Sequence, residues 1–303
     1  MAAKMAATQT VLLVAGEASG DDHGASLVAA VQQRHPELRF FGMGGSKLRA
    51  LGMDTVVDSE RSASLMGVSE LRGSLSTVVD SYKRLLTEVE ARKPATAVLI
   101  DYAEFNMRLA QTLHARGVKV LYFIPPQMWA WRQGRVKKIR RFVDRVAAIF
   151  PFEESFYARH KVRAQFVGHP FCYKEPVAPR EQYLPQIGLD PTLPVLALLP
   201  GSRHSELTRL LVPMLDAAPL IRRGRLGLQV VITVAASLDF GEVKQLAAPY
   251  TGVTVVKGSA REILSSADAA VVASGTATVE AALTGVPFVA VYRLAPFTFF
   301  LAK

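Results

Sequence analysis

Short apolar runs alternate with longer amphipathic segments along the chain. The run at 195–199, VLALL, is apolar at every position, which is typical of a strand buried on both faces of a parallel sheet. The segment 75–92 instead has apolar residues at helical spacing and ends before a proline. Further strand-like runs begin near Val11, Phe40, Val56, Ala97, Val118, Val146, Gln165, Val230, Val253, Ala269 and Phe288. Regular alternation of strands and helices predicts an α/β fold.

A proline-rich segment divides this pattern into two halves. Residues 170–179 contain three prolines and are interpreted as a linker. A chain of 303 residues is long enough for two medium domains with substantial cores. We therefore predict two doubly wound, Rossmann-like α/β domains that face each other across a cleft, the first over residues 1–172 and the second over residues 173–303.

The loops that follow two strands of the second half suggest a nucleotide site. The run 195–199 leads into Pro200-Gly201-Ser202-Arg203, and the guanidinium of Arg203 suits a phosphate. The run 269–273 leads into Ser274-Gly275-Thr276 and a helix that carries Glu280. Two such loops favour a nucleotide diphosphate, with Arg203 near its phosphates and Glu280 near its sugar. Ordinary solvated charges near helix caps are an equally good explanation of either residue alone.

Asp101 is the candidate general base of the first half. It follows the apolar run 97–100, where partial desolvation raises the proton affinity of a carboxylate. A helix-capping aspartate is the alternative, and the chemistry alone does not decide between them. Glu104 and Asn106 are close enough in sequence to share the site. The loops GEASGD (16–21) and GMGG (42–45) are neither a phosphate-binding P-loop nor a dinucleotide fingerprint, and GMGG could be a tight turn only.

Composition narrows the remaining classes of function. The single cysteine, Cys172, excludes an internal disulfide, and the histidines show no metal-ligand spacing, so no metal is expected. Lys and Arg number 36 against 26 Asp and Glu, which favours an anionic partner. The basic segment 132–145 has Val136, Ile139, Val143 and Val146 at helical spacing and predicts an amphipathic helix. A solvated face explains it best, an anionic membrane second and nucleic acid third. No apolar stretch approaches the roughly 20 residues of a membrane-spanning helix, so a soluble or peripheral protein is expected.

Eight motifs in order resemble one family, lipid-A-disaccharide synthase, a GT-B glycosyltransferase of Gram-negative bacteria. The resemblance covers the chain almost from Val11 to its end. The motifs are GEASGD (16–21), GMGG (42–45), LMGVSE (65–70), PQMWAW (126–131), FPFE (150–153), FVGHP (166–170), LPGSRHSE (199–206) and ASGTATVE (273–280). The resemblance implies that 2,3-diacylglucosamine is transferred, with inversion, from UDP-2,3-diacylglucosamine to the 6-hydroxyl of 2,3-diacylglucosamine 1-phosphate. The products are the β-1′,6-linked disaccharide 1-phosphate and UDP.

The resemblance also implies roles for individual residues. Asp101 is the catalytic base, and the loop Gly258–Leu264 contacts the uracil. The residues implied to bind the UDP-sugar are Gly201, Ser202, Arg203, Ser274, Gly275, Thr276 and Glu280. Those implied to meet the acceptor and its acyl chains are Glu17, Ser19, Met66, Gly67, Glu70, Asn106, Gln127 and Trp129. No cofactor, metal or nucleic acid is implied. A cytoplasmic enzyme attached peripherally to the inner membrane, and possibly a homodimer, is expected.

The sequence departs from the family in three places. Ala103 stands where the family's DxPxFN stretch has its proline, and Pro125 stands where a serine is common. Family members also continue several tens of residues beyond this chain, so the second domain is expected to be incomplete, with Phe297, Phe299 and Phe300 left exposed. A truncated, non-catalytic UDP- or lipid-binding remnant of the fold is therefore the alternative function. A nucleotide-sugar epimerase is a weaker one, because it does not explain the lipid-facing motifs.

Overall fold

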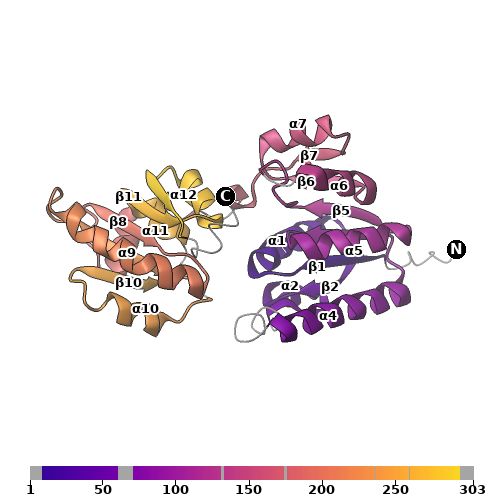
Figure 1. Ribbon diagram of the computed structural model, residues 1–303, viewed down its shortest axis with the longest axis horizontal. Helices are drawn as coiled ribbons and strands as arrows, with labels where there is room; N and C mark the ends of the chain where they lie inside the picture. Colours follow the sequence, from indigo (N-terminus) through magenta and orange to yellow (C-terminus); the bar gives the residue numbers. More distant parts are fainter. Residues whose placement is uncertain are drawn as a thin grey trace. The chain divides into compact units, whose positions relative to one another are not determined.

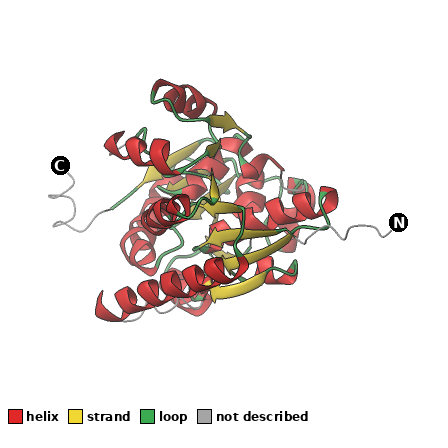
Figure 2. Cartoon of the chain, turned by 90° about the vertical axis from the view of Figure 1, so that its right-hand side faces the viewer, coloured by secondary structure: helices red, strands yellow, loops and turns green. Residues whose placement is uncertain are grey.

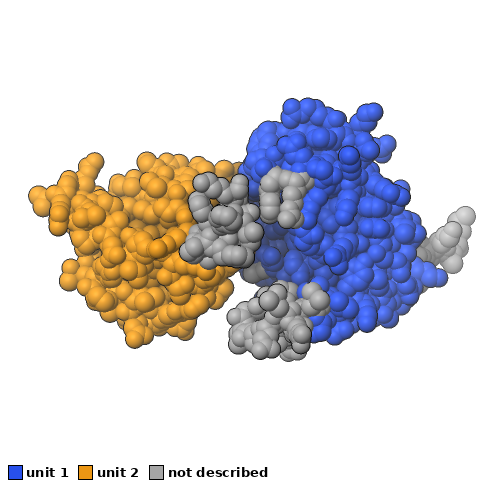
Figure 3. Space-filling view, viewed as in Figure 1, with its two compact units in different colours: residues 1–170 blue, residues 171–303 orange. Residues whose placement is uncertain are grey.

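The chain folds as two compact units, which meet in sequence between Pro170 and Phe171 (Figure 3). The computed structural model describes residues 9–60, 71–130, 133–173, 176–235, 237–258 and 260–293. In both units, strands and helices alternate along the chain (Figures 1 and 2). The two-domain α/β architecture that the sequence predicts is confirmed. The predicted division after residue 172 lies two residues from the division between the units.

The first unit contains a parallel sheet of seven strands in the order β3-β2-β1-β4-β5-β6-β7. Its strands are β1 (Thr10–Ala15), β2 (Arg39–Gly44), β3 (Asp54–Asp58), β4 (Thr96–Ile100), β5 (Lys119–Phe123), β6 (Arg145–Ala148) and β7 (Ala164–Phe166). Its helices are α1 (Ala18–Arg34), α2 (Ser46–Ala50), α4 (Leu71–Arg92), α5 (Ala103–Ala115), α6 (Val136–Phe142) and α7 (Pro151–Arg159), with a 3-10 turn η1 (Gln133–Arg135).

Both faces of this sheet are buried, because alternate residues of each strand enter different cores. Leu12 and Val14 of β1 pack into the core under α4, α5, α6 and α7. Leu13 and Ala15 pack into a second core under α1 and α2. This two-sided burial explains why strands of a doubly wound sheet read as continuous apolar runs. Figure 1 shows α1, α2, α4 and α5 around β1 and β2.

The second unit contains a parallel sheet of five strands in the order β10-β9-β8-β11-β12. Its strands are β8 (Val195–Leu199), β9 (Gln229–Val234), β10 (Val253–Lys257), β11 (Ala269–Ala273) and β12 (Phe288–Val291). Its helices are η2 (Pro170–Tyr173, a 3-10 turn that begins at the boundary), α8 (Arg180–Gln186), α9 (His204–Arg222), α10 (Phe240–Ala247), α11 (Ala260–Ser266) and α12 (Thr276–Thr284). All five residues of β8 are buried, and they alternate between a core under α8, α11 and α12 and a core under α9 and α10.

The predicted basic helix over 132–145 is shorter than expected. Helix α6 ends at Phe142, Val143 has extended dihedral angles, and Val146 belongs to β6. The Asp144 carboxylate accepts hydrogen bonds from the Val120 N–H at 2.9 Å and from Lys119 Nζ at 3.0 Å, which ties this turn to the start of β5. The helical interpretation was wrong beyond Phe142, whereas the strand predicted to begin near Val146 is confirmed by β6. Val146 continued the helical spacing by coincidence. Val136 and Ile139 are buried as predicted, and the charges of α6 face outward.

Candidate active site

In each unit, loops that carry predicted site residues follow the two strands between which the strand order of the sheet reverses. This switch point lies between β1 and β4 in the first unit, where Ala15 is paired with Ile100. In the second unit it lies between β8 and β11, where Leu199 is paired with Val272. Ligands of open α/β sheets bind in the crevice beyond the carboxyl ends of the strands at such a point. The topology therefore brings the loop after β1 to that of Asp101, and the loop after β8 to that of Ser274.

Asp101 begins an unusual turn between β4 and α5. Asp101 and Tyr102 have φ angles of 46° and 47°, in the left-handed region that residues with a Cβ seldom adopt. The Asp101 N–H donates to the Phe123 carbonyl at 3.2 Å. The N-cap of α5 is Tyr102, and no side chain caps this helix. The alternative of a helix-capping aspartate is therefore not what the fold contains.

The environment of Asp101 favours its protonated form. Burial, with the negative charge of Glu17 as a second cause, raises the pKa of this carboxyl to about 6, and the Tyr102 N–H acts in the opposite direction. Glu17 is exposed at the end of β1, one strand away. The raised proton affinity expected for a partly desolvated carboxylate is thus present. Such a group still ionises at neutral pH, and it binds a proton more strongly than an ordinary aspartate.

A buried polar support lies under Asp101. Asn106 is 0% exposed, and its Nδ2 donates to the Asp101 carbonyl at 2.8 Å and to the Ile100 carbonyl at 3.1 Å. This burial argues against the predicted contact between Asn106 and an acceptor. The Tyr122 hydroxyl donates to the same Asp101 carbonyl at 2.9 Å. Tyr122 was not predicted as a site residue, although a tyrosine in an apolar strand signals that its hydroxyl needs a buried partner.

Hydrogen bonds connect the GEASGD motif of the first unit to the GMGG motif and the start of α2. The Asp21 carboxylate of GEASGD accepts hydrogen bonds from the N–H of Gly45 at 2.6 Å and of Lys47 at 3.0 Å. A Cβ on Gly45 would lie 2.7 Å from an oxygen of Asp21. A Cβ on Gly16 would lie 2.2 Å from the ring of Tyr102, so this glycine lets the loop of Glu17 approach the loop of Asp101. The tight-turn interpretation of GMGG is wrong for its first three residues, because β2 continues to Gly44 and only Gly45 lies between β2 and α2. The side chains of Glu17 and Ser19 remain accessible.

The loop after β5 is held by a buried carboxylate. Glu153 is 1% exposed, and its Oε1 accepts a hydrogen bond from Trp129 Nε1 at 3.2 Å. Its Oε2 accepts from the N–H of Ile149 and of Phe150, both at 3.1 Å, and burial raises its pKa. The Trp129 ring packs edge-on against Phe152, with ring centroids 4.8 Å apart. The FPFE motif therefore orients Trp129. Gln127 is exposed, and Met66, Gly67 and Glu70 lie outside the described residues.

The loop after β8 satisfies its own backbone. Gly201 has a φ of 108°, and a Cβ there would lie 2.3 Å from Glu206 Oε2. That oxygen accepts hydrogen bonds from the N–H of Ser202 at 3.1 Å and of Arg203 at 3.3 Å. The amides expected to face a phosphate therefore already bind a carboxylate. The Arg203 side chain is 71% exposed, with Nη1 3.3 Å from Glu206 Oε1. Glu206 was not predicted, although a Glu in the first turn of a helix is the signal of a capping box.

The loop after β11 is open to solvent. Ser274, Gly275 and Thr276 are exposed, and the Ser274 N–H donates to the Val291 carbonyl at 2.8 Å. Glu280 is half-buried one turn into α12. In the predicted uracil loop Gly258–Leu264, Ile263 and Leu264 are each 1% exposed and belong to the core. Gly258, the first residue of that loop, is exposed.

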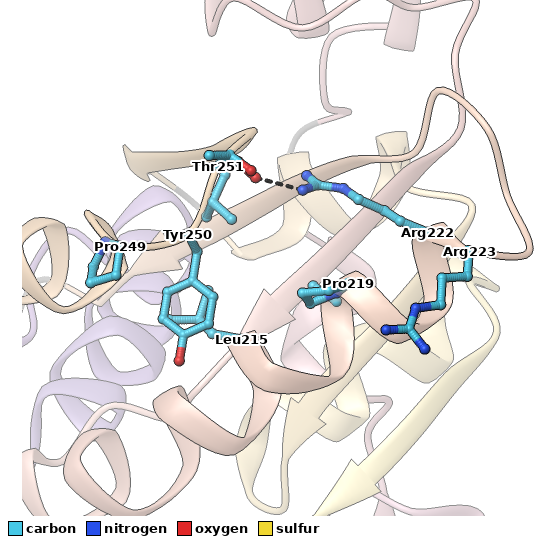
Figure 4. A pocket seen from close by; sticks show the side chains of 9 residues that line it. Leu215, Pro219, Arg222, Arg223, Pro249, Tyr250 and Thr251 are labelled. Atoms are coloured by element: carbon cyan, nitrogen blue, oxygen red, sulfur yellow. Dashed lines mark hydrogen bonds between the residues drawn. The ribbon is translucent and has the colours of Figure 1, made fainter.

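A cavity of about 430 Å³ in the second unit lies away from these loops (Figure 4). Its lining includes Val253, the first residue of β10, and Arg222, the last residue of α9, so it opens at the amino edge of the sheet. The Arg222 guanidinium donates to the carbonyls of Thr251, Gly252 and Leu228, and Figure 4 shows the first of these bonds. Arg222 therefore holds the chain between α10 and β10, and this cavity is separate from the switch point.

The described parts of the chain contain neither a cluster of metal ligands nor a helix that could cross a membrane. These ranges contain no group of three or more His, Cys, Asp or Glu side chains that could hold a metal ion. His204 lies instead beside Glu242, with Nδ1 3.4 Å from a carboxylate oxygen. Within the same ranges, every helix falls short of the length and apolar character that a membrane crossing requires.

Comparison with known sequences agrees with the motif pattern. A family model described as lipid-A-disaccharide synthetase matches residues 11–303. The lipid-A-disaccharide synthase of Koribacter versatilis is 43% identical over 290 residues, which cover 94% of this chain and 75% of that protein. The synthase of Myxococcus xanthus is 44% identical over 296 residues, which cover 97% of this chain and 77% of that protein.

Comparison with solved structures bears on the fold alone, because the identities are low. The UDP-GlcNAc 2-epimerase of Neisseria meningitidis bound to UDP-GlcNAc has a TM-score of 0.66 at 11% identity, covering 97% of this chain and 85% of that one. The glycotransferase of kitacinnamycin has a TM-score of 0.60 at 14% identity, covering 95% and 81%. The GT-B type of fold, with two Rossmann-like domains, is thereby confirmed.

Proposed function

Because this chain belongs to the lipid-A-disaccharide synthase family and is a glycosyltransferase of lipid A biosynthesis, we propose that it joins two acylated glucosamines. The donor is UDP-2,3-diacylglucosamine and the acceptor is 2,3-diacylglucosamine 1-phosphate. The products are the β-1′,6-linked disaccharide 1-phosphate and UDP. The observation that carries the proposal is the Asp101 carboxylate at the first switch point, where its pKa is raised to about 6.

Asp101 acts as the general base. Its ionised carboxylate takes the proton of the acceptor 6-hydroxyl while the hydroxyl oxygen attacks the anomeric carbon of the donor. The bond from that carbon to the UDP oxygen breaks on the opposite side, which inverts the configuration. A carboxylate with raised proton affinity is suited to this step, because it accepts the proton more readily than an ordinary aspartate and is still ionised at pH 7.

The second switch point holds the donor. Arg203 places an exposed cation at the end of β8, where it can bind the diphosphate that carries the departing charge. Gly201 and Ser202 shape this turn, and Ser274, Gly275 and Thr276 offer exposed donors on the neighbouring strand. Glu280 binds the ribose hydroxyls. Since Glu206 already occupies the amides of Ser202 and Arg203, side chains carry most of the diphosphate binding.

The first unit holds the acceptor. Glu17 and Ser19 lie beside the base, and Gln127 and Trp129 come from the loop after β5. Met66, Gly67 and Glu70 belong to the same group by their place in the family motif. The exposed aromatic ring of Phe152, 48% accessible, extends the Trp129 surface and offers apolar area to acyl chains.

The basic side of the first unit binds an anionic membrane surface, which places the enzyme peripherally on the cytoplasmic face of the inner membrane. Helix α6 exposes Lys137, Lys138, Arg140 and Arg141 while its apolar residues are buried. A depression of about 210 Å³ beside it is lined by Arg140, Arg141, Lys161 and Arg163, with His114 and Asp144. Clusters of this kind attract acidic lipids by about 1 kcal/mol per basic residue near the surface.

Mass spectrometry of the products tests the proposed reaction. The purified chain is incubated with UDP-2,3-diacylglucosamine and 2,3-diacylglucosamine 1-phosphate, with the Asp101→Ala variant alongside. Disaccharide from the parent and almost none from the variant is expected. A folded parent that yields no product would contradict the proposed activity, and equal product from both proteins would contradict Asp101 as the base.

A further inference from the structure

We propose that Tyr122 and Asn106 are positioning residues that fix the Asp101 side chain by binding the Asp101 main-chain carbonyl from inside the fold. The inference rests on the proposed role of Asp101 as the base, and it adds two residues that do not touch either substrate. Three observations carry it: the backbone conformation of Asp101, the hydrogen bonds at its carbonyl, and a buried acceptor left without a partner.

The turn at Asp101 needs outside support. Asp101 and Tyr102 are consecutive residues with a Cβ in the left-handed region, at φ angles of 46° and 47°. Such conformations are strained and persist where the surroundings over-determine them. The Asp101 N–H is bonded to the Phe123 carbonyl at 3.2 Å, and the Asp101 carbonyl accepts from Asn106 at 2.8 Å and from Tyr122 at 2.9 Å. The peptide groups on both sides of the Asp101 Cα are therefore held by hydrogen bonds.

The two donors come from different elements and are both buried. Tyr122 lies on β5, the neighbour of β4, and Asn106 lies in the second turn of α5. Both side chains are 0% exposed. Burial raises the pKa of Tyr122 well above its usual range, so its hydroxyl keeps the proton that it donates. Asp101 is thus anchored to the strand beside it and to the helix after it.

The Asn106 side-chain amide satisfies two main-chain carbonyls, while its own oxygen is left without a hydrogen bond among the described residues. Its Nδ2 must face Ile100 and Asp101, because both partners are carbonyl oxygens that only accept. Its Oδ1 is then buried with no hydrogen-bond partner among the described residues. An unsatisfied buried acceptor is unfavourable. We expect such a cost to be tolerated where a residue is needed to position the site, and not where it only fills space in the core.

Fixing this carbonyl fixes the direction of the Asp101 side chain. Rotation of the peptide plane after Asp101 changes the direction in which its Cβ leaves the backbone relative to the sheet edge. A general base must lie within hydrogen-bond reach of the hydroxyl that it deprotonates, and a misplacement of about 1 Å can lower a rate by about 100-fold. Loss of one donor should therefore slow the chemical step and leave substrate binding largely intact.

The chain offers a matched control in Tyr157 of α7. Tyr157 is 0% exposed, belongs to the same core as Tyr122, and its hydroxyl has no hydrogen-bond partner among the described residues. Tyr157→Phe therefore removes a buried tyrosine hydroxyl without removing a bond to Asp101. Tyr122→Phe removes a hydroxyl together with its bond to the Asp101 carbonyl.

The experiment compares kcat and both KM values of Tyr122→Phe and Tyr157→Phe, made in the full chain and checked by thermal unfolding. We expect Tyr122→Phe to lower kcat by about 10- to 100-fold with unchanged KM for the UDP-sugar, and Tyr157→Phe to match the parent. In an Asp101→Asn background, Tyr122→Phe should cause no further loss. This non-additivity is the sign of residues acting through one group.

Three outcomes would overturn the inference. Equal kcat for Tyr122→Phe and Tyr157→Phe would show that the bond to the carbonyl does not matter to the reaction. A loss from Tyr122→Phe that persists undiminished in the Asp101→Asn background would show that Tyr122 acts on something else. An Asp101→Asn enzyme as active as the parent would remove the base assignment itself, a failure distinct from the other two because it is seen before Tyr122 is changed.

Discussion

The switch points of the two sheets present opposite surroundings for charge. At the first, the Asp101 carboxylate is withdrawn from water on a strained turn, and burial raises its pKa to about 6. At the second, the Arg203 guanidinium is 71% exposed on a loop whose amides are satisfied by Glu206. Both loops lie at the same place in the same kind of sheet. The difference comes from the buried and capping side chains that hydrogen-bond the backbone of each loop.

The supports suggest a division of labour between the two units. Tyr122 and Asn106 bind the backbone of Asp101, which holds one side chain in place for a proton transfer. Glu206 binds the backbone before Arg203 and leaves the guanidinium exposed, which suits the capture of a ligand from solution. Changes at the first switch point should therefore appear mainly in kcat, and changes at the second mainly in substrate affinity.

The largest effect is expected from Asp101→Asn. The amide keeps the shape of the carboxyl and cannot take a proton at neutral pH, so kcat should fall by about 1,000-fold or more, near the upper range for a general base. The affinity for UDP, measured by calorimetry, should stay within about twofold of the parent. Parallel losses of kcat and of UDP affinity would break the proposed division between the units.

Arg203→Ala should produce the converse result. Loss of a charged donor to the diphosphate should raise the KM for the UDP-sugar by about 10- to 100-fold, since hydrogen bonds to charged groups are worth about 1.5–3 kcal/mol. Arg209→Ala is the control, because Arg209 is an exposed arginine within α9, the helix that follows Arg203. If both variants have the KM of the parent, Arg203 does not bind the donor.

Asp101→Asn should also make the fold more stable at neutral pH. The pKa of Asp101 rises from an ordinary 3.8 to about 6 on folding, so between these values the folded protein binds more protons than the unfolded chain. The stability of the parent therefore falls as pH rises through this window and stays low above it. Asparagine does not ionise, so the Asp101→Asn variant loses no stability over this pH window. Asparagine also adopts the left-handed region more readily than aspartate does. The gain should be at most about 3 kcal/mol at pH 7.5 and shrink towards pH 4.

Thermal unfolding of the two proteins at pH 4, 6 and 7.5 measures this difference. The stabilisation should accompany the loss of activity, as expected where a site stores unfavourable energy for its function. Asn106→Leu should not be stabilised in this way, because that change removes the hydrogen bonds to the Ile100 and Asp101 carbonyls. A Tm difference between Asp101→Asn and the parent that is independent of pH would show that burial does not disfavour the charge.

The sequence was sufficient to predict the strands that flank both switch points, although not the order of the strands. Five apolar residues before Pro200 and four before Asp101 identify strands buried on both faces, and parallel strands bring their following loops to one edge. On that logic, the loops of Arg203 and Ser274 were assigned to one ligand without any knowledge of strand order. They lie at one edge because β8 and β11 are neighbours in their sheet. The pairing of β1 with β4, which brings the loop of Glu17 to that of Asp101, was not predicted.

The residues that hold these loops in place could not be predicted. Their roles depend on which strands and helices are neighbours, and hydrophobic periodicity does not contain that information. Tyr122 reaches the Asp101 carbonyl only because β5 lies beside β4, and Glu153 reaches Trp129 from a helix that follows a different strand. Asn106 was assigned to the acceptor because its motif lies next to Asp101, yet helical geometry turns it inward. Extending the basic helix to Val146 was wrong for a related reason, although the strand near Val146 was predicted as well, since valines suit a buried strand and a helix face equally.

The smallest effect is expected from Glu17→Gln, which tests whether the two loops of the first switch point act together. The charge of Glu17 adds to burial in raising the pKa of Asp101, so its removal should move the acid limb of the pH–kcat profile, expected near pH 6 in the parent, to lower pH. Glu17 is exposed, and salt screens exposed charges, so the parent and the variant should converge at high ionic strength. Glu154→Gln, an exposed glutamate of α7, should leave the limb in place. An unmoved limb in Glu17→Gln would mean that burial alone sets the proton affinity of Asp101, and that the loop after β1 contributes shape rather than charge to the first switch point.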